Sequence, residues 1–140
     1  MADVIYNSFK GKIMDGSVDM DTDTLKVALV TATYTPNQDT HDFFDDVTNE
    51  VSGTGYTAGG ASLASKAVTV DTTDNEGVFD AADVTWSTAT ITARGAVLYK
   101  YTGTASTSAL ICYFDFGSDQ SSSASDFTIA WNAEGIINLN

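Results

Sequence analysis

Three aspartates with the spacing of calcium ligands are the first residues that could carry chemistry. Asp19, Asp21 and Asp23 occupy alternate positions, as do the first three oxygen ligands of a calcium-binding loop. The rest of that loop is missing, because its position 6 is Thr24 instead of glycine and its position 12 is Val30 instead of glutamate. The pattern excludes an EF-hand. A looser divalent-ion site and a solvated acidic turn before a strand both stay open, and the acidic turn is favoured.

A glycine-rich segment has the spacing of a dinucleotide-binding fingerprint. Residues 53–58 read GTGYTA, and Gly59 and Gly60 follow at once. The fingerprint requires a strand before it and a helix after it, so that the helix N-terminus meets the pyrophosphate. The chain has neither that helix nor an alternation of strands with helices. We therefore expect no bound cofactor and read the segment as a surface loop with an exposed Tyr56.

Nucleophilic catalysis needs a base beside a serine or cysteine, and the chain has only one histidine, His41, next to Asp42. No serine stands in a Gly-x-Ser-x-Gly elbow, and Cys112 lies in an apolar strand pattern typical of a buried thiol. With 19 acidic residues, carboxylate pairs occur at any separation by chance, so they do not indicate a glycosidase. We expect no enzyme, no catalytic residues and no metal site.

Charge and hydropathy limit the partners. Nineteen acidic and six basic residues give a net charge of −13, which repels phosphate backbones and anionic lipid headgroups. The longest apolar run, residues 109–114, is much shorter than the roughly 20 residues of a membrane span. We therefore expect neither nucleic acid nor membrane as a partner, and synthesis in a cytoplasm-like compartment.

One helix is expected, at the start of the chain. Ile5, Phe9 and Ile13 recur every four residues, and Asp3 stands where an N-cap would be. The pattern predicts an amphipathic helix from Asp3 to Met14 within an N-terminal segment of residues 1–14. The pair at residues 15–16, Asp-Gly, is a natural stop.

The rest of the chain has the composition and alternation of strands. Thr, Val, Tyr and Phe are frequent, and Leu25, Val27 and Leu29 alternate with residues that also look covered. We predict eight or nine short strands, at residues 25–31, 47–51, 67–71, 77–80, 84–86, 91–101, 110–116, 127–131 and 136–139. Such strands favour a single domain over residues 1–140 that is mainly β, an antiparallel β-sandwich or jelly-roll-like fold.

Two segments interrupt this pattern. Residues 35–46 form an excursion with one helical turn, which contains an adjacent aromatic pair, Phe43 and Phe44, among acidic residues. Both rings cannot point inward from one strand, so at least one is a candidate contact for another chain. Residues 120–126 hold four serines and are predicted to be a polar connection.

The chain as a whole resembles small virion proteins of tailed bacteriophages. The blocks that carry the resemblance extend over nearly the full length; they are ADVIYNSFK (residues 2–10), DTDTLKVALV (21–30), DDVTNEVSGTGYTAGG (45–60), ITARGAV (91–97) and WNAEGII (131–137). The resemblance implies a structural role, most of all a capsid decoration or cement protein on the outer surface of the head shell. It also implies a β-sandwich or jelly roll, assembly as a dimer or trimer, and the major capsid protein or another virion protein as partner.

On this basis the residues predicted to bind a partner are apolar; they are Ile5, Phe9, Ile13, Phe43, Phe44 and Tyr56. The alternative for the first three is that the helix closes one end of the sandwich. The alternative function is a tail or fibre module that binds a host-surface glycan, with Tyr56 stacking on a sugar and an acidic calcium site beside it.

Overall fold

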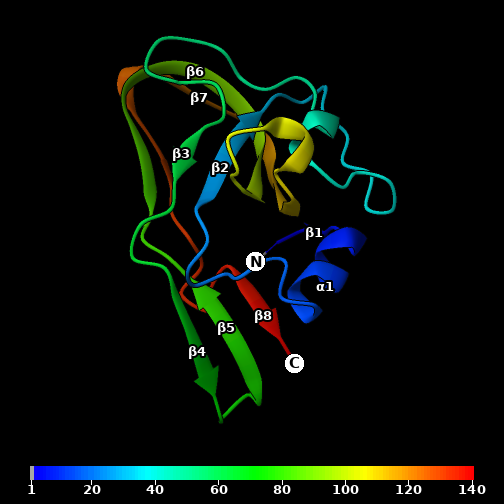
Figure 1. Ribbon diagram of the computed structural model, residues 1–140. Coiled ribbons are helices and arrows are strands. Elements are labelled where there is room, and N and C mark those ends of the chain that lie inside the picture. Colours follow the sequence, from blue (N-terminus) through cyan, green and yellow to red (C-terminus); the bar gives the residue numbers. More distant parts are fainter. Residues whose placement is uncertain (1) are drawn as a thin grey trace.

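The computed structural model of the protein describes residues 2–140 and has two antiparallel sheets (Figure 1). The strands of the larger sheet lie in the order β1 (Val4–Ile5), β7 (Leu110–Ile129), β6 (Val84–Lys100), β2 (Leu25–Val30) and β3 (Ala61–Ser62). The smaller sheet has the order β4 (Ala67–Asp71), β5 (Glu76–Asp80) and β8 (Ile137–Leu139). The chain is therefore mainly β, as predicted, with an arrangement consistent with a β-sandwich.

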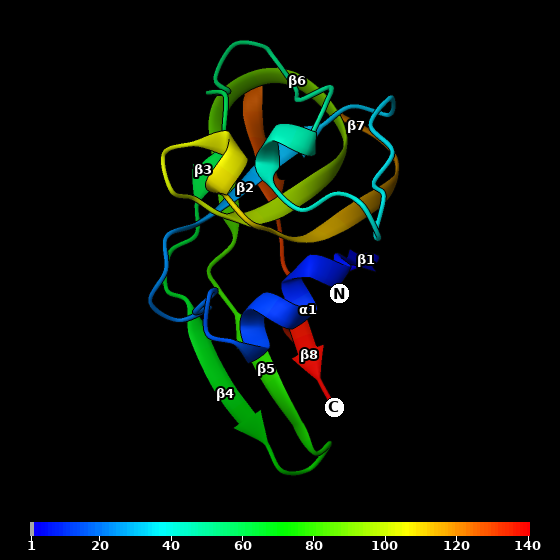
Figure 2. The same ribbon diagram turned by 45° about the vertical axis from the view of Figure 1, so that its right-hand side comes forward.

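Two long strands, β6 and β7, make up most of the larger sheet. They pair from Val84–Ile129 at one end to Tyr99–Leu110 at the other, with four register shifts on the way. Both ribbons curve strongly through the top of the molecule in Figures 1 and 2, as expected where bulges bend a pair of strands. The prediction of separate short strands at 84–86 and 91–101, and at 110–116 and 127–131, was therefore wrong in that each pair is one strand.

The serine-rich segment 120–126 is part of β7 and does not form a separate connection. Ser121 lies opposite Thr92 on β6, and their hydroxyl oxygens are 2.8 Å apart. The Ser122 hydroxyl donates to the carbonyl of Ala89 at 2.8 Å. Most side chains here are exposed, so the local sequence looks like a loop although the backbone is paired.

The N-terminal helix is shorter than predicted. Helix α1 spans Asn7–Met14, and Val4–Ile5 form strand β1 instead, opposite Tyr113 and Cys112 of β7. Asp3 does not cap the helix, because its carboxylate accepts the backbone N–H of Asp115 at 2.7 Å. Backbone pairing of Val4–Ile5 with β7 therefore stabilises this segment more than a further helical turn would. The predicted stop is confirmed by Gly16, which has φ +78°.

The segment 47–51, predicted as a strand, makes only one bridge, between Glu50 and Val30. The excursion at 35–46 does contain the expected turn, the 3₁₀ helix η1 (Phe44–Asp46). A second such turn, η2 (Ala105–Thr107), lies between β6 and β7.

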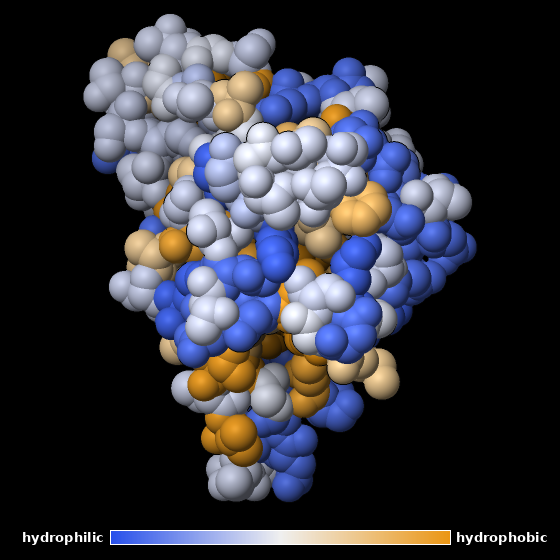
Figure 3. Space-filling model, viewed as in Figure 1, coloured by the Kyte–Doolittle hydropathy of each residue, from blue (hydrophilic) through white to orange (hydrophobic). Residues whose placement is uncertain are grey.

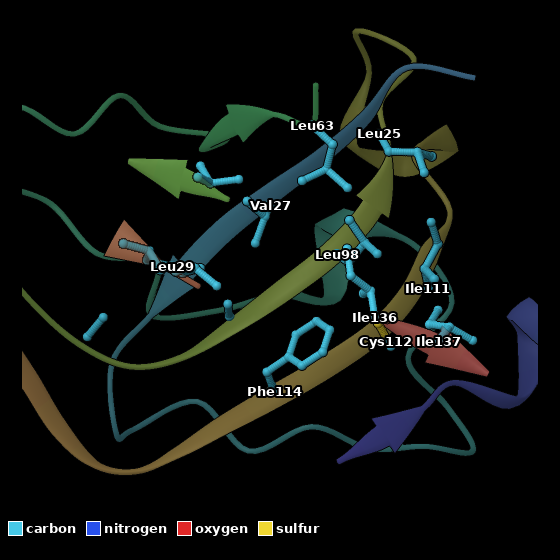
Figure 4. Close-up of a cluster of buried hydrophobic side chains, with 14 of the residues drawn as sticks. Leu25, Val27, Leu29, Leu63, Leu98, Ile111, Cys112, Phe114, Ile136 and Ile137 are labelled. Atoms are coloured by element: carbon cyan, nitrogen blue, oxygen red, sulfur yellow. The ribbon is translucent and has the colours of Figure 1, made fainter. Parts of the chain in front are cut away.

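The central part of the larger sheet, around β2, is covered on both faces, as the alternation in β2 predicts. Leu25, Val27 and Leu29 belong to the main hydrophobic cluster, with side chains from β6, β7 and β8 (Figure 4). Ala28 and Val30 point the other way, into a second cluster that contains several tyrosines. The core of the protein therefore lies on both sides of β2.

The smaller sheet extends from that body at the lower end of Figures 1 and 2, with α1 across its base. Its β4–β5 hairpin turns through residues 72–75. The Asp71 carboxylate accepts the backbone N–H groups of Thr73 and Asp74 at 2.7 and 3.2 Å, and Asn75 has φ 59°. Asp and Asn are the residues that stabilise such a turn.

Candidate functional site

Exposed apolar side chains gather on the smaller sheet. Val68 and Val70 on β4 are 56% and 80% exposed, and Leu139 on β8 is 53% exposed. Figure 3 shows hydrophobic side chains gathered at the lower end of the molecule, where Figure 1 places β4, β5 and β8. A group of exposed valine and leucine side chains on a projecting sheet is typical of a surface that another molecule covers.

These side chains share one face because of the strand register. Val68 pairs with Phe79 and Phe79 with Ile137, while Val70 pairs with Gly77 and Gly77 with Leu139. Residues directly opposite one another on neighbouring strands point to the same face. In the row Val68–Phe79–Ile137, the second and third side chains are buried. In the row Val70–Gly77–Leu139, Val70 and Leu139 are both exposed. We call this surface the apolar face of the smaller sheet.

A groove of about 380 Å³ runs between this face and the N-terminal part of the chain. Phe9 and Ile13 of α1 line it from one side and Val68, Phe79 and Leu139 from the other. Gly77 lies on its floor without a side chain, and a Cβ added there would meet no atom within 4 Å. The groove is therefore apolar and has room for a side chain of a partner.

The opposite face of the smaller sheet is acidic. A hollow of about 440 Å³ is lined by four carboxylate residues, Asp71, Glu76, Asp80 and Glu134, and by no basic residue among those described. The backbone N–H groups of Thr73 and Asp74 hold the pKa of the Asp71 carboxyl below its ordinary value. One Asp80 oxygen, Oδ1, is buried and has no hydrogen-bond partner among the described residues. We call this surface the acidic face.

The predicted contact residues of the N-terminal segment lie against the core. Phe9 is buried within the main cluster, and Ile5 and Ile13 are half-buried against it. Only Ile13 and Phe9 reach the groove. This packing fits a helix that closes one end of the fold, and a direct contact of these residues with a partner stays a prediction.

Phe43 and Phe44 point to different clusters, as their adjacency requires. Phe43 packs against the main cluster, with Lys12 Nζ 4.3 Å from its ring centroid. Phe44 stacks on Tyr99 at 4.1 Å between ring centroids and packs against the second cluster. Both rings are half-buried within this chain, so each has a structural role whether or not it also contacts a partner.

Tyr56 is not the exposed residue that the glycine-rich segment predicts. Its ring is half-buried beside Trp86, at 5.8 Å between centroids. Its hydroxyl accepts the backbone N–H of Leu29 at 2.9 Å and donates to Glu50 at 2.7 Å. Burial, together with the Glu50 carboxylate, raises the pKa of this hydroxyl. The glycine-rich sequence predicted an exposed loop. In the structure, Gly60 instead lets the loop pack on β2.

The three aspartates at 19, 21 and 23 form a turn stabilised by its own backbone. Asp19 Oδ1 accepts the N–H groups of Asp21 and Thr22, at 3.0 and 3.2 Å. Asp23 Oδ2 accepts the N–H of Asp19 at 2.8 Å and forms an ion pair with Lys100 at 2.9 Å. Within residues 2–140 no group of three or more His, Cys, Asp or Glu side chains is arranged to hold a metal ion.

His41 and Cys112 lie in different surroundings. His41 Nδ1 is 3.0 Å from the Tyr34 hydroxyl and accepts the backbone N–H of Asn37 at 3.3 Å. Tyr34 in turn shares a hydrogen bond of 2.8 Å with the buried Tyr6 hydroxyl. Cys112 is fully buried in β7, and this burial raises the pKa of its thiol. The structure thus does not bring the two residues together as nucleophile and base.

Sequence reasoning placed the β4 strand correctly but did not single out its valines. The alternation of Val68 and Val70 with Thr69 indicates an apolar face. No local signal indicates that this face is uncovered, because that depends on what other segments pack over it.

No protein-family model matches this chain, and no significant match to it occurs among the curated proteins or the solved structures. None of the helices within residues 2–140 combines the length and the apolar character needed to cross a membrane. A function is therefore proposed from the sequence resemblance and the surfaces described above.

Proposed function

We propose that this protein is a non-enzymatic structural protein of a tailed-bacteriophage virion, a decoration protein that binds the outer surface of the head shell and stabilises it. The proposal takes its class from the sequence blocks at 2–10, 21–30, 45–60, 91–97 and 131–137. It places the protein on the capsid surface after synthesis in the bacterial host, as a dimer or trimer in contact with the major capsid protein.

The observation that carries a binding role is the apolar face of the smaller sheet. Val68 and Val70 are more than half exposed on a hairpin that extends from the larger sheet and its two hydrophobic clusters. Exposed apolar side chains gathered on one surface are typical of a protein contact.

The mechanism is linkage between binding and assembly. A protein that binds the assembled shell and not its separated subunits adds its binding free energy to the stability of the shell. With many copies on one particle, a modest affinity at each site is sufficient. The net charge of −13 also keeps neighbouring particles apart through mutual repulsion.

The alternative, a tail module that recognises a glycan, depended on an exposed aromatic side chain and a calcium site. The Tyr56 ring is half-buried with its hydroxyl already engaged by Leu29 and Glu50. The structure therefore offers no observation that favours this alternative over decoration.

The test is to locate and count the chain in purified particles of the phage that encodes it. Decoration requires hundreds of copies on the head, seen by imaging and by quantitative mass spectrometry. Shells prepared without the protein should come apart at a lower temperature, and adding the purified protein should restore their stability. A handful of copies at the tail, or particles without the chain, would refute the proposal.

A further inference from the structure

Strand β4 lies at the edge of the smaller sheet and is paired on one side only. Its partner is β5, and β8 occupies the far side of β5. An edge strand offers unpaired backbone N–H and C=O groups to another chain, and proteins usually protect such edges with charge, proline or a bulge. The β4 sequence, AVTVD, has no proline and no charge before its last residue, Asp71.

We propose that β4 takes up an extended segment of a partner protein as an added strand, and that this segment alternates apolar with basic residues. The inference rests on the proposed function, because it names the surface and the partner chemistry of a binding protein. An added strand would place successive side chains on opposite faces of the sheet. The apolar face and the acidic face therefore each specify half of its residues.

The apolar half of the segment is specified by Val68 and Val70. Side chains of an added strand on this face would lie directly beside them, since cross-strand neighbours approach to about 5 Å. Val68 also lines the groove that continues over Gly77 to α1. A large apolar side chain from the partner would thus contact Val68 and could extend into this groove.

The basic half is specified by the acidic face. Ala67 of β4 lies opposite Asp80 of β5, and both residues line the hollow on the acidic face. A lysine or arginine on the added strand would lie beside Ala67, at the hollow that the four carboxylate residues of the acidic face line. Because no described basic residue lines this hollow, its carboxylates favour a basic side chain at that position.

A second copy of this chain fits the edge less well. If two β4 strands paired around Thr69, each acidic face would receive Ala67, Thr69 and Asp71 from the other copy, and none of these is basic. The nearest lysine, Lys66, already donates to the backbone carbonyl of Asp23.

The test measures binding of three synthetic peptides to the full-length protein. The first is a seven-residue peptide alternating lysine and valine, the second alternates glutamate and valine, and the third has the composition of the first in block order. We expect chemical shifts of the β4 backbone amides to change with the first peptide, with an affinity at least about tenfold above the other two. Equal binding of all three, or shifts confined to other strands, would overturn the proposal.

Variants separate the two faces. The double substitution Val68→Ser and Val70→Ser should weaken the lysine–valine peptide about tenfold or more, whereas Met14→Ser, which removes an exposed apolar side chain outside the edge, should not. Asp80→Asn should reduce the preference for lysine over glutamate and leave the contribution of valine unchanged. Circular dichroism and thermal unfolding establish that each variant is folded, and an unchanged peptide preference in folded variants would contradict the proposal.

The same variants distinguish this inference from the proposed function. If the double valine variant binds shells as well as the unchanged protein does, the edge is not the docking site although decoration still holds. If the unchanged protein binds the peptide but no shell, decoration fails while the edge remains a strand-binding site. A dimer in sedimentation experiments that the double variant abolishes would assign the edge to a second copy and overturn the inference.

Discussion

At the scale of single residues, Gly60 is the glycine at which an added Cβ would come closest to another atom. Gly60 has φ +74°, and a Cβ added to it would lie 1.8 Å from the carbonyl oxygen of Val27 on β2. The residue therefore lets the loop that carries Tyr56 lie directly on the central strands. Gly103 has a similar backbone, φ +90°, but open space around it.

We expect Gly60→Ala to lower the free energy of unfolding by at least about 2 kcal/mol more than Gly103→Ala. The control substitution costs only the strain of a positive φ, about 1–2 kcal/mol, whereas the first also forces β2 and the loop apart. Guanidinium unfolding of both variants measures the difference. Equal losses would mean that the loop can move away from Val27 at no cost.

At the scale of elements, helix α1 is stabilised more by the burial of Phe9 than by the helix propensity of its residues. Phe9 is 1% exposed, Tyr6 at its N-cap makes no side-chain capping bond, and Gly11 lies in its middle. Glycine inside a helix and a missing cap both weaken it. The helix therefore depends on the docking of Phe9 against the sheets.

We expect Phe9→Ala to destabilise the protein by about 3–5 kcal/mol, because it leaves a cavity in the main cluster. Met14→Ala, on the same helix, changes a side chain that is 88% exposed and should stay within about 0.5 kcal/mol. Thermal unfolding followed by circular dichroism compares the two. A small loss for Phe9→Ala would show that α1 is not part of the cooperative core.

At the scale of the whole molecule, buried tyrosine hydroxyls determine the behaviour at high pH. Burial raises the pKa of Tyr6 and of Tyr56 above the ordinary value of 10.0. A group whose pKa is raised by folding stabilises the native state fully below the unfolded pKa. That stability decreases as the pH rises above the unfolded value, because only the unfolded chain then releases the proton.

We therefore expect the free energy of unfolding to stay level up to about pH 9 and to fall above the ordinary tyrosine value of 10.0. Guanidinium unfolding at a series of pH values measures this. The Tyr6→Phe variant has no ionisable group at position 6. Its free energy of unfolding should therefore fall less steeply with pH above 10.0. A level curve to pH 11 in the unchanged protein would contradict the expectation.

Properties that depend on neighbouring residues could be predicted from the amino-acid sequence. Alternation in residues 25–31 predicted a strand covered on both faces, which the structure has at Leu25–Val30, and the Asp-Gly pair at 15–16 predicted the end of the helix. The β4 and β5 strands, the turn at Phe44 and the acidic turn at Asp19 were also found. Each of these depends on side-chain periodicity or turn chemistry over a few residues, which the local sequence contains.

The pairing of distant segments, and the side chains that they cover, became known from the three-dimensional arrangement. The serine-rich part of β7 is a strand because β6 lies beside it, and Val4–Ile5 leave the helix because β7 offers them a partner. Tyr56 is half-buried because glycines let its loop approach β2, and Val70 is exposed because no segment among the described residues covers it. Pairing and coverage are long-range properties, so the candidate binding surface could be located only in three dimensions.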